Sequence, residues 1–563
     1  MENFSLGIQQ DHLSSVALFK NEELIYFNQE ERLSRKKKDR DIPFKCLEEI
    51  KNKFKKVNIA IVTGYDSGSY RSLSKYLINI GIIENQNKLI NFHKSHHLAH
   101  AIKSFYSSGF DNAIVFVVDG KGSSYLLNNG SIGFETTSVY EIDHFNIKCI
   151  FKKILTEDFN LTNDLKVNYT LDNLTGKKIQ PISIDENTIF EISSIDLGHF
   201  YGVISSNFNW SENEGKLMGL SAYGKNDLEI EKIFKNKDFF IEEDGGKKVN
   251  SYKYKEFNIE KIENKTKLLN LSYMAQKKFE EDYLNLLSKI LINKKNKNVI
   301  LTGGTALNVV NNYKLKKNFL KDYNLYIEPV CGDEGNSIGI AQLYIREIYK
   351  KKEKLNFNVK NLYLGPKYNY IFNLNSSENS LKNVSLDYIV DLIIQQKIVA
   401  LYQNKAEAGP RALGNRSLLF DSRNVNSKNI LNKIKKRENF RPFACSILEE
   451  EVHNWFDLGN LKKSEYMMYA PYVKENKKNI ISSVVHIDNT CRVQTVSQKD
   501  NFVLYNILKM FFEKTKVPLL INTSFNLKDE PIVETPDDAI NSFRNSDLQY
   551  LFFSDIKTLI IKK

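Results

Sequence analysis

Short apolar runs separated by polar turns recur along the chain and predict alternating strands and helices. Alternating apolar positions in residues 4–31, interrupted by the polar sequence KNEE, predict two strands joined by a turn. Runs rich in valine and isoleucine at residues 58–63 and 113–119 predict further strands, and between them a helix is expected to begin after its N-cap, Ser95. The first part of the chain is therefore predicted to be a layered α/β structure.

The same alternation continues through the rest of the chain. Residues 125–190 are strand-like and polar, and residues 268–293 have helical periodicity. The strand NVILTGG and the helix TALNVVNNYKL are expected to follow. A lysine-rich stretch at 350–362 is typical of a linker, and the sequence IIQQKIVALYQ after it opens a second α/β unit.

Composition limits the class of protein. With 563 residues the chain is too long for one hydrophobic core, so two or three domains are expected. It contains no apolar run of about eighteen residues, and its N-terminus lacks the basic-then-apolar profile of a signal peptide, so we expect a cytoplasmic protein with no membrane partner. Five cysteines stand far apart without a CxxC pair, which predicts free thiols in a reducing compartment.

The charge balance leaves a nucleic-acid partner open. Lysine and arginine total 80 against 68 acidic residues, which gives a net charge of +12. Such an excess can attract a polyanion. However, the lysines are scattered with glutamates nearby, and the densest basic run, Arg35–Lys38, is typical of a solvated loop.

A histidine cluster indicates a metal site. The sequence HHLAHA places three of the chain's 9 histidines at residues 96–101. On a helix His96 and His100 face the same way and can bind one metal ion, or they can be a surface pair or core groups with satisfied hydrogen bonds. Asp119, at the end of a strand, and Asp333, in a glycine-flanked turn, can complete the site. Two imidazoles and two carboxylates suit Fe(II), Mn(II) or Mg(II) and leave positions open for phosphate oxygens.

Glycine-rich turns are candidates for binding the phosphates of a nucleotide. Gly120, directly after Asp119, lets the backbone approach a ligand. A strand runs into Gly303 and Gly304 and then into a predicted helix, which aims N–H groups at an anion, although a tight turn also explains the pair. Lys216, in EGKLMGLSAYGK, lies in a predicted glycine-rich turn that can close on phosphates or can be a simple loop.

Several long motifs together resemble the O-carbamoyltransferases of the NodU and CmcH type. They are GKLMGLSAYG, TGGTALN, EAGPRALGNRSLLFDSRN, KKRENFRPFACSIL and LLINTSFNLKDEPIVETPDDAINSF. The match runs in order from GIQQDHLSSVAL to DLQYLFFSD, so it covers nearly the whole chain, and it is weakest between residues 125 and 195.

The resemblance implies an α/β protein with an N-terminal domain of the actin-like ATPase type at residues 1–355 and a YrdC-like domain at residues 356–563. In that family the C-terminal domain makes carbamoyl-adenylate from carbamoyl phosphate and ATP, and the N-terminal domain passes the carbamoyl group to a hydroxyl. His12 matches a candidate general base, although Leu13 follows it where the family usually has aspartate. The implied metal ligands are His96, His100, Asp119 and Asp333. The implied nucleotide contacts are Lys37, Gly120, Lys216, Gly303, Gly304 and Asn308.

Cations in the second half of the chain suit a small dianion. Guanidinium groups match the geometry of phosphate and neutralise its charge. A surface salt bridge explains most single arginines, but glycine, proline and phenylalanine surround most of these. The motifs supply Arg411, Arg416, Lys435, Arg437, Arg441 and Arg492. The predicted carbamoyl phosphate shell is Arg411, Lys435, Arg441, Arg492, Asn522 and Ser524.

The expected activity is ATP-dependent O-carbamoyl transfer from carbamoyl phosphate to a hydroxyl. The acceptor is left open between a small molecule, a sugar and a hydroxymethylated base in DNA. Two other functions are considered, a tRNA threonylcarbamoyl-adenosine-type enzyme and a non-catalytic ATP-sensing module. The motifs RALGNRS and NTSFN argue against the tRNA enzyme, because they resemble the carbamoyl phosphate users.

Overall fold

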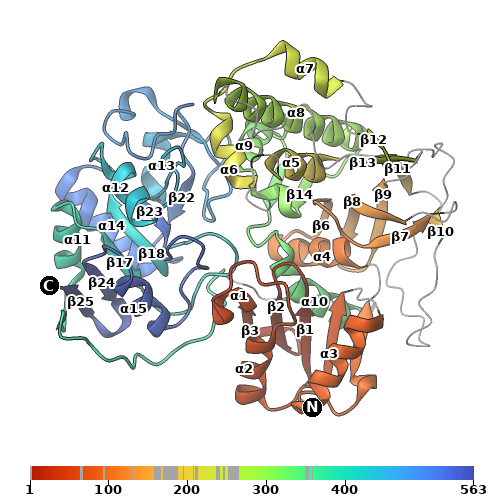
Figure 1. Ribbon diagram of the computed structural model, residues 1–563, viewed down its shortest axis with the longest axis horizontal. Helices are drawn as coiled ribbons and strands as arrows, with labels where there is room; N and C mark the ends of the chain where they lie inside the picture. The colour runs from red at the N-terminus through yellow and green to blue at the C-terminus, as the bar shows by residue number, and fades with distance from the viewer. Residues whose placement is uncertain are drawn as a thin grey trace. The chain divides into compact units, whose positions relative to one another are not determined.

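A computed structural model of the chain (Figure 1) shows a mixed α/β protein, as expected. It describes residues 3–63, 67–92, 95–127, 132–156, 167–168, 188–193, 196–206, 208, 214–235, 241–244, 247–250, 265–348, 354–357, 359 and 361–563. Parts of the predicted strand region 125–190 and of the predicted linker 350–362 lie outside these residues.

The chain forms two compact units, and neither is one continuous stretch. The first unit comprises residues 1–25, 41–308 and 322–359. The second comprises residues 26–40, 309–321 and 360–563. Two short segments from the first part of the chain therefore belong to the second unit, and the domain boundary expected after residue 355 stays a prediction.

The N-terminal sheet has the strand order β3-β2-β1-β4-β5. Three strands stand where two were predicted, because the chain also turns at residues 10–14. In that turn Asp11 and Leu13 have φ angles of 74° and 56°, a left-handed conformation that an apolar pattern does not reveal. The strands are β1 (Phe4–Gln9), β2 (Ser15–Lys20), β3 (Glu23–Gln29), β4 (Ile59–Thr63) and β5 (Leu89–Phe92).

The second sheet of the first unit has the order β10-β7-β8-β6-β14-β15, with β9 beside β8 and β11 beside β9. The predicted strands at 113–119 and in NVILTGG are β6 and β14, which pair in parallel. The strands are β6 (Asn112–Val118), β7 (Ser124–Leu127), β8 (Ile132–Asp143), β9 (Ile147–Thr156), β10 (Val167–Asn168), β11 (Ile189–Ser193), β14 (Asn298–Thr302) and β15 (Asn324–Ile327).

The predicted helices at 96 and 268–293 are present as α4 and α8. The expected helix TALNVVNNYKL is wrong at its start, because a 3-10 turn at Gly304–Leu307 precedes α9. The helices of the first unit are α2 (Phe44–Phe54), α3 (Ser67–Asn79), α4 (His96–Ser108), α5 (Leu197–Ser206), α6 (Glu214–Ser221), α7 (Leu228–Lys235), α8 (Lys265–Leu291) and α10 (Asn336–Ile348). A small hairpin adds β12 (Ile241–Asp244) and β13 (Lys247–Asn250).

Two helices lie between the sheets of the first unit. Helix α10 packs on β1, β2 and β4, helix α4 packs on β6 and β14, and the two helices pack on each other (Figure 1). The contact is very close: a Cβ added to Gly339 would lie 2.0 Å from the carbonyl oxygen of Ala99. Ile102 and Phe105 of α4 and Val115 and Val117 of β6 share one core. This core fixes the helix that carries the histidine cluster.

The second unit has one mixed sheet in the order β16-β25-β24-β17-β18-β23-β19-β22. Its strands are β16 (Glu378–Leu381), β17 (Val399–Tyr402), β18 (Arg416–Asp421), β19 (Ala444–Leu448), β22 (Val493–Val496), β23 (Leu519–Ser524), β24 (Tyr550–Phe553) and β25 (Thr558–Lys562). A two-stranded pair comprises β20 (Phe456–Asp457) and β21 (Tyr472–Val473). The helices are α1 (Glu30–Ser34), α9 (Val309–Asn318), α11 (Leu386–Ile394), α12 (Ser427–Ile434), α13 (Val452–Trp455), α14 (Phe502–Thr515) and α15 (Pro536–Arg544).

Two features of the whole chain follow from this description. All five cysteines are free and buried, as predicted. Within the described ranges, none of the helices has both the length and the apolar character needed to cross a lipid bilayer.

Candidate metal and anion sites

The four predicted metal ligands meet at one point of the first unit. His96 and His100 lie one turn apart on α4, Asp119 directly follows β6, and Asp333 begins a 3-10 turn before α10. One ligand atom from each residue lies within 4.8 Å of the other three. The close packing of α4 on β6 and α10 therefore brings together residues that are more than 200 positions apart in the sequence.

The imidazoles alternate with the carboxylates in this cluster. His96 Nε2 lies 3.5 Å from Asp119 Oδ2 and 3.3 Å from Asp333 Oδ1. His100 Nε2 makes the same two approaches, at 3.5 Å and 3.3 Å. His100 is fully buried, and the other three ligands are largely buried. Each of these four histidine–aspartate approaches therefore brings a nitrogen and an oxygen to a common point.

Backbone N–H groups orient the Asp119 carboxylate. Its Oδ1 accepts hydrogen bonds from the N–H groups of Gly120 at 2.9 Å and Gly304 at 3.0 Å, which leaves Oδ2 facing the histidines. The Gly304 N–H was expected to point at a nucleotide anion from a helix N-terminus, but the helix begins at Val309. Gly303 has a φ of 85° and packs against the backbone of Val118. The glycine pair thus supports the metal cluster, by which we mean the four side chains of His96, His100, Asp119 and Asp333. Contact of the glycine pair with a nucleotide stays a prediction.

The acidic groups control the charge of this cluster. Burial by itself would lower the pKa of His96, but Asp333 and Asp119 raise that pKa well above its ordinary value. Burial opposes ionisation of Asp333 as well, yet the neighbouring imidazoles hold its pKa well below the usual range. Two ionised carboxylates beside two imidazoles form a site that a divalent cation can neutralise.

The donor set fits a divalent metal ion. Nitrogen and oxygen donors without thiolate suit Fe(II), Mn(II) and Mg(II) better than soft metals. The carboxylate oxygens face inward although their like charges oppose this arrangement, and the surrounding packing holds them there. The residues present are therefore compatible with the ion that the sequence predicts.

His12 lies at the edge of the cluster. It occupies the turn between Asp11 and Leu13, and its Nδ1 is 3.6 Å from Asp333 Oδ2. Its side chain is 36% exposed, whereas His100 is buried. An imidazole that borders the cluster and also reaches solvent has the position required of a base that accepts a proton from an incoming hydroxyl.

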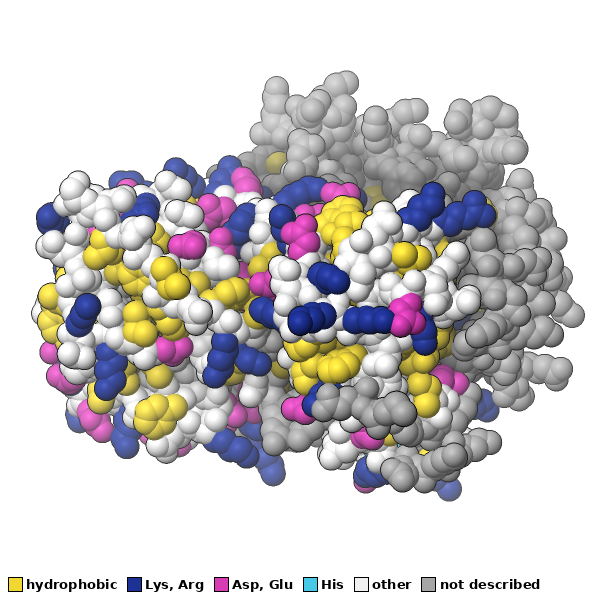
Figure 2. Space-filling model, turned by 90° about the horizontal axis from the view of Figure 1, so that it is seen from below, with side chains coloured by type: hydrophobic (Ala, Val, Ile, Leu, Met, Phe, Trp, Pro, Cys, Tyr) yellow, Lys and Arg dark blue, Asp and Glu magenta, His cyan; other side chains and the backbone are white. Residues whose placement is uncertain are grey.

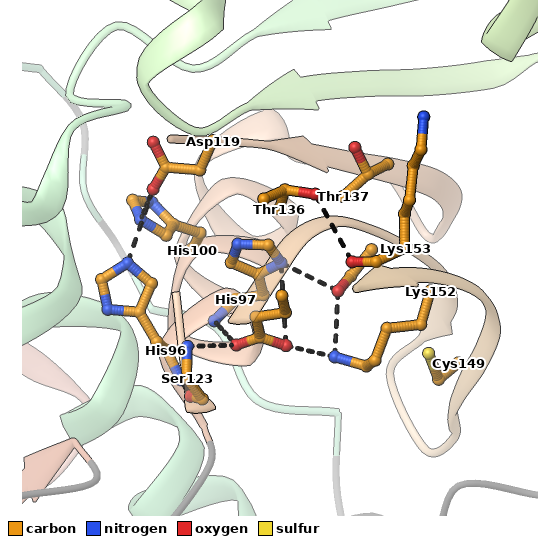
Figure 3. A network of polar contacts seen from close by, with 12 residues as sticks. His96, His97, His100, Asp119, Ser123, Thr136, Thr137, Cys149, Lys152 and Lys153 are labelled. Carbon is orange, nitrogen blue, oxygen red and sulfur yellow. Dashed lines mark hydrogen bonds and ion pairs between the residues drawn. The ribbon is translucent and has the colours of Figure 1, made fainter. Parts of the chain in front are cut away.

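His97, the histidine of HHLAHA that is not a predicted ligand, has a different environment. His97 is fully buried, and its Nδ1 lies 2.8 Å from Ser138 Oγ, facing β8 and β9 (Figure 3). Burial lowers the pKa of His97 to about 3, so it is neutral. The spacing of the motif does not reveal this network, which also contains Glu135 and Lys152.

Two predicted nucleotide residues have unexpected surroundings. Lys216 lies on helix α6 and not in a glycine-rich turn, because GKLMGLS continues the helix that begins at Glu214. Asn308 pairs its amide with that of Gln276, at 3.0 Å and 3.2 Å. Their contact with a nucleotide stays a prediction.

The predicted anion shell gathers at one edge of the second unit's sheet. Strands β18 and β19 both run antiparallel to β23, and β22 runs parallel to β19. The first residues of β18 and β19 therefore lie beside the last residues of β23, and the first residues of β22 lie beside those of β19. Arg411, Arg441 and Arg492 precede these three strands, and Asn522 and Ser524 end β23.

Lysine and arginine residues at this edge repel one another. Burial lowers the pKa of Lys435 well below its ordinary value, and the charges of Arg437, Lys37 and Arg441 lower it further. Burial and the charges of Arg411 and Arg437 have the same effect on the pKa of Arg492. The cluster therefore holds an excess of positive charge that a bound dianion would relieve.

Lys37 belongs to this second cluster. The exposed lysine lies on the 26–40 segment, which is part of the second unit, and its charge acts on Lys435. The same segment is attached by Arg32, which donates to the carbonyl oxygen of Gly409 at 2.7 Å. A lysine assigned to nucleotide phosphate by sequence resemblance thus lies among the cations assigned to carbamoyl phosphate.

Two members of the predicted anion shell are held by neighbouring protein atoms. The Lys435 ammonium donates to the carbonyl oxygens of Ser524 and Asn526, at 2.5 Å and 3.0 Å. Asn522 is fully buried, and its Nδ2 donates to Ser446 Oγ at 2.8 Å and to Gln494 Oε1 at 3.1 Å. Lys435 therefore shapes the end of β23 in addition to contributing its charge.

Two arginines from the same motifs have different roles. Arg416 is fully buried, donates to the carbonyl oxygens of Gln403 and Asn404, and lies 3.6 Å from the Tyr402 ring, so it supports the fold. Arg437 was omitted from the predicted shell, yet its guanidinium lies 4.1 Å from the Phe443 ring, and burial together with Arg441 lowers its pKa to about 9. The sequence signal that could have identified Arg437 is its position in KKRENFRPF, between Lys435 and Arg441 of the predicted shell.

The comparisons with solved structures give only weak overlap. The crystal structure of full-length HypF in its phosphate- and nucleotide-bound form aligns with a TM-score of 0.36 at 15% identity, covering 62% of this chain and 56% of that chain. Component A of the (R)-2-hydroxyglutaryl-CoA dehydratase of Acidaminococcus fermentans aligns with a TM-score of 0.33 at 13% identity, covering 62% of this chain and all of that one.

Sequence comparisons are more informative. The chain is 29% identical to a protein of Methanocaldococcus jannaschii over 98% of both chains. It is 28% identical to the nodulation protein NolO of Bradyrhizobium diazoefficiens over 81% of this chain and 77% of the relative. The model for the carbamoyltransferase N-terminus matches residues 51–342, and the model for the carbamoyltransferase C-terminus matches residues 390–562. The chain is therefore a member of the carbamoyltransferase family.

Proposed function

We propose that this carbamoyltransferase uses ATP and carbamoyl phosphate, through carbamoyl-adenylate, to carbamoylate a hydroxyl group. The observation that carries the proposal is the convergence of His96, His100, Asp119 and Asp333 within 4.8 Å. The cation cluster at the sheet edge of the second unit supports it, because its lysine and arginine residues outnumber nearby carboxylates such as Glu438, which pairs with Arg441, and this excess of positive charge suits a small dianion.

The proposed division of work follows the two clusters. Arg411, Arg441 and Arg492, with Lys37 and Lys435 nearby, bind the phosphate of carbamoyl phosphate and neutralise charge during the release of that group. A divalent ion held by the four ligands in the first unit would supply positive charge for nucleotide phosphates. We assign the first cluster to the N-terminal domain and the second to the C-terminal domain of the family.

The transfer step joins the acceptor oxygen to the carbamoyl carbon, and AMP leaves that carbon with its bonding electrons. The hydroxyl proton must depart at the same time. His12 is the proposed base, because it is half-exposed and lies 3.6 Å from Asp333 at the edge of the metal cluster. Asp333 would also stabilise the imidazolium that forms.

The acceptor is proposed to be a small molecule or sugar in preference to DNA. On the face drawn in Figure 2, the described lysine and arginine side chains are dispersed among acidic and uncharged ones. Recognition of a DNA duplex relies on a concentrated basic surface. A DNA acceptor would make activity fall steeply with salt, and a small neutral acceptor would not.

The proposal is tested by incubating the purified chain with ATP, carbamoyl phosphate and a panel of hydroxylated acceptors. The panel includes sugars and DNA that contains hydroxymethylcytosine. Mass spectrometry should detect one added carbamoyl group on an acceptor, with AMP and pyrophosphate released in equal amounts. Carbamoylation that proceeds equally well without ATP would contradict the adenylate route.

A further inference from the structure

The amino end of helix α4 is capped by residues from outside the helix. Ser95 stands at the N-cap position, but its hydroxyl donates to the carbonyl oxygen of Phe92 and caps no N–H group. The N–H of His96 donates instead to Ser123 Oγ at 3.2 Å, and the N–H of His97 donates to Glu135 Oε1 at 3.3 Å. The first turn of the helix that carries the cluster is therefore attached to the second sheet.

Glu135 connects both of these caps. Its Oε1 also accepts the N–H of Ser123 at 3.0 Å, so the residue that caps His96 is itself held by the carboxylate that caps His97. Glu135 lies on β8, which pairs with β6, the strand that Asp119 directly follows. One carboxylate thus links the histidine-bearing helix to the sheet that carries a third ligand.

The other oxygen of Glu135 is used inside the protein. Oε2 pairs with Lys152 on β9 and accepts a hydrogen bond from Tyr125 at 3.2 Å. Glu135 has no exposed surface, and Lys152 is 2% exposed. A buried ion pair contributes little net stability compared with apolar residues of the same size, because both charges lose their hydration. The pair therefore invites an explanation other than stability.

We propose that Glu135 is a positioning residue for the metal cluster. By holding the N–H groups of His97 and Ser123, its Oε1 sets the rotation of α4 about its axis, so that His96 and His100 face Asp119. Lys152 keeps the carboxylate ionised and fixed in one rotamer. This inference rests on the proposed metal site and adds to it a residue that touches neither metal nor substrate.

The opposite end of the cluster is braced in a similar way. Lys103, three residues after His100, pairs with Glu328, and both are buried. Glu328 Oε1 also accepts the N–H of Val330, on the segment that leads to Asp333. Helix α4 is therefore tied at one end by hydrogen bonds to Ser123 and Glu135, and at the other end by a buried ion pair to the segment that leads to Asp333.

Two double variants separate the capping role of Glu135 from its charge. E135Q/K152M and E135M/K152M both remove the ion pair and leave no unpaired buried charge. Only the glutamine keeps an oxygen that can accept the two N–H groups, and methionine has nearly the same length. Affinity for Mn(II) is measured by isothermal titration calorimetry on the full chain at constant pH.

We expect E135Q/K152M to keep the Mn(II) affinity of the unaltered chain. E135M/K152M should lose about 10–100-fold, the usual cost of removing a residue that orients a metal ligand. Equal affinities in the two variants would overturn the positioning role. S138A, which alters the same network without touching either cap, should bind Mn(II) as the unaltered chain does.

A second measurement keeps this test independent of the proposed function. Amide hydrogen exchange of residues 96–98, without metal, should be faster in E135M/K152M than in E135Q/K152M. Absence of Mn(II) binding by the unaltered chain would refute the metal site, whereas equal exchange in both variants would refute the cap. If E135M/K152M does not fold, S123A takes its place, and its Mn(II) affinity should fall; an unchanged affinity would overturn the inference.

Discussion

At the scale of single residues, the members of the metal cluster are held to different degrees. Asp119 is fixed by two backbone N–H groups, and His100 is fully buried on a packed helix. His12 lies in a turn, its side chain is 36% exposed, and its Nδ1 is 3.6 Å from Asp333 at the edge of the cluster. The buried residues suit a fixed ligand role, and the half-exposed one suits a role in proton transfer.

We predict that His100→Ala removes bound metal and abolishes carbamoyl transfer. The substitution deletes one of the four donors and leaves two buried carboxylates facing each other with less compensation. Metal content is measured by mass spectrometry after dialysis, beside the rate of transfer. His144→Ala is the control, because His144 pairs with the exposed Asp111. Full activity of His100→Ala after chelation would show that the cluster is structural.

Substitution of an arginine in the anion shell should affect one substrate selectively. Arg441→Ala is predicted to raise the KM for carbamoyl phosphate about 10–100-fold, since a hydrogen bond to a charged group contributes about 1.5–3 kcal/mol. The KM for ATP should change much less. Arg71→Ala serves as the control, because Arg71 is exposed on α3 of the first unit and lies outside the anion shell. Equal increases in both KM values would remove Arg441 from the carbamoyl phosphate shell.

At the scale of secondary-structure elements, the contact between α4 and α10 determines whether the ligands meet. Asp333 precedes α10, and the histidines lie on α4, so the separation of these two helices sets the size of the cluster. Gly339 permits that separation, because any side chain at this position would overlap the backbone of Ala99.

Gly339→Ala should destabilise the first unit by about 1–3 kcal/mol, the usual cost of overpacking a core, and should weaken metal binding. Urea-induced unfolding measures the free energy, and calorimetry measures the affinity. Gly215→Ala, on α6, is the matched helical control, because an added Cβ there meets no atom within 4 Å. We expect that control to be neutral or to stabilise by up to about 1 kcal/mol. The same loss in both variants would show that the helix contact is not limiting.

At the scale of the whole molecule, the metal cluster and the cation cluster belong to different units, each with its own sheet. The cations are brought together by strand direction in the second unit, and the metal ligands by helix packing in the first. Each cluster should therefore keep its ligand when the other is impaired.

Chelation tests this independence. Treatment with a strong chelator should abolish carbamoyl transfer and leave the binding of inorganic phosphate to the chain unchanged. Phosphate at about 100 times its dissociation constant should stabilise the second unit by about 2.7 kcal/mol with or without metal. Differential scanning calorimetry measures the stabilisation by phosphate with and without metal, and the transfer assay measures activity. Loss of phosphate binding after chelation would show that the clusters are coupled.

Much of the fold was predictable because it depends on local periodicity. The strands β4, β6 and β14 and the long helix α8 have strong apolar patterns, and these predictions are confirmed. The turn that carries His12 was missed, because left-handed residues such as Asp11 and Leu13 leave no hydrophobic signal. Helix α6 was missed at Lys216, because its glycines suggested a turn.

The candidate sites divide in the same way. His96 and His100 could be paired from helical spacing, whereas Asp119 and Asp333 could be added only by assuming that distant turns meet. The position of Lys37 in the second cluster was not predictable, because it depends on where the 26–40 segment docks. The contact of Glu135 with α4 was not predictable either, since no motif around Glu135 indicates that its side chain accepts N–H groups from His97 and Ser123.

The amino-acid sequence by itself determined the family, the alternation of strands and helices, and the donor types available for metal and phosphate. Those properties depend on residue identity and short-range spacing. The tertiary structure alone decided which distant carboxylates join the histidines, which oxygens cap α4 and which cations share an edge. The physical reason is that helix packing and strand direction, which involve residues hundreds of positions apart, set these distances.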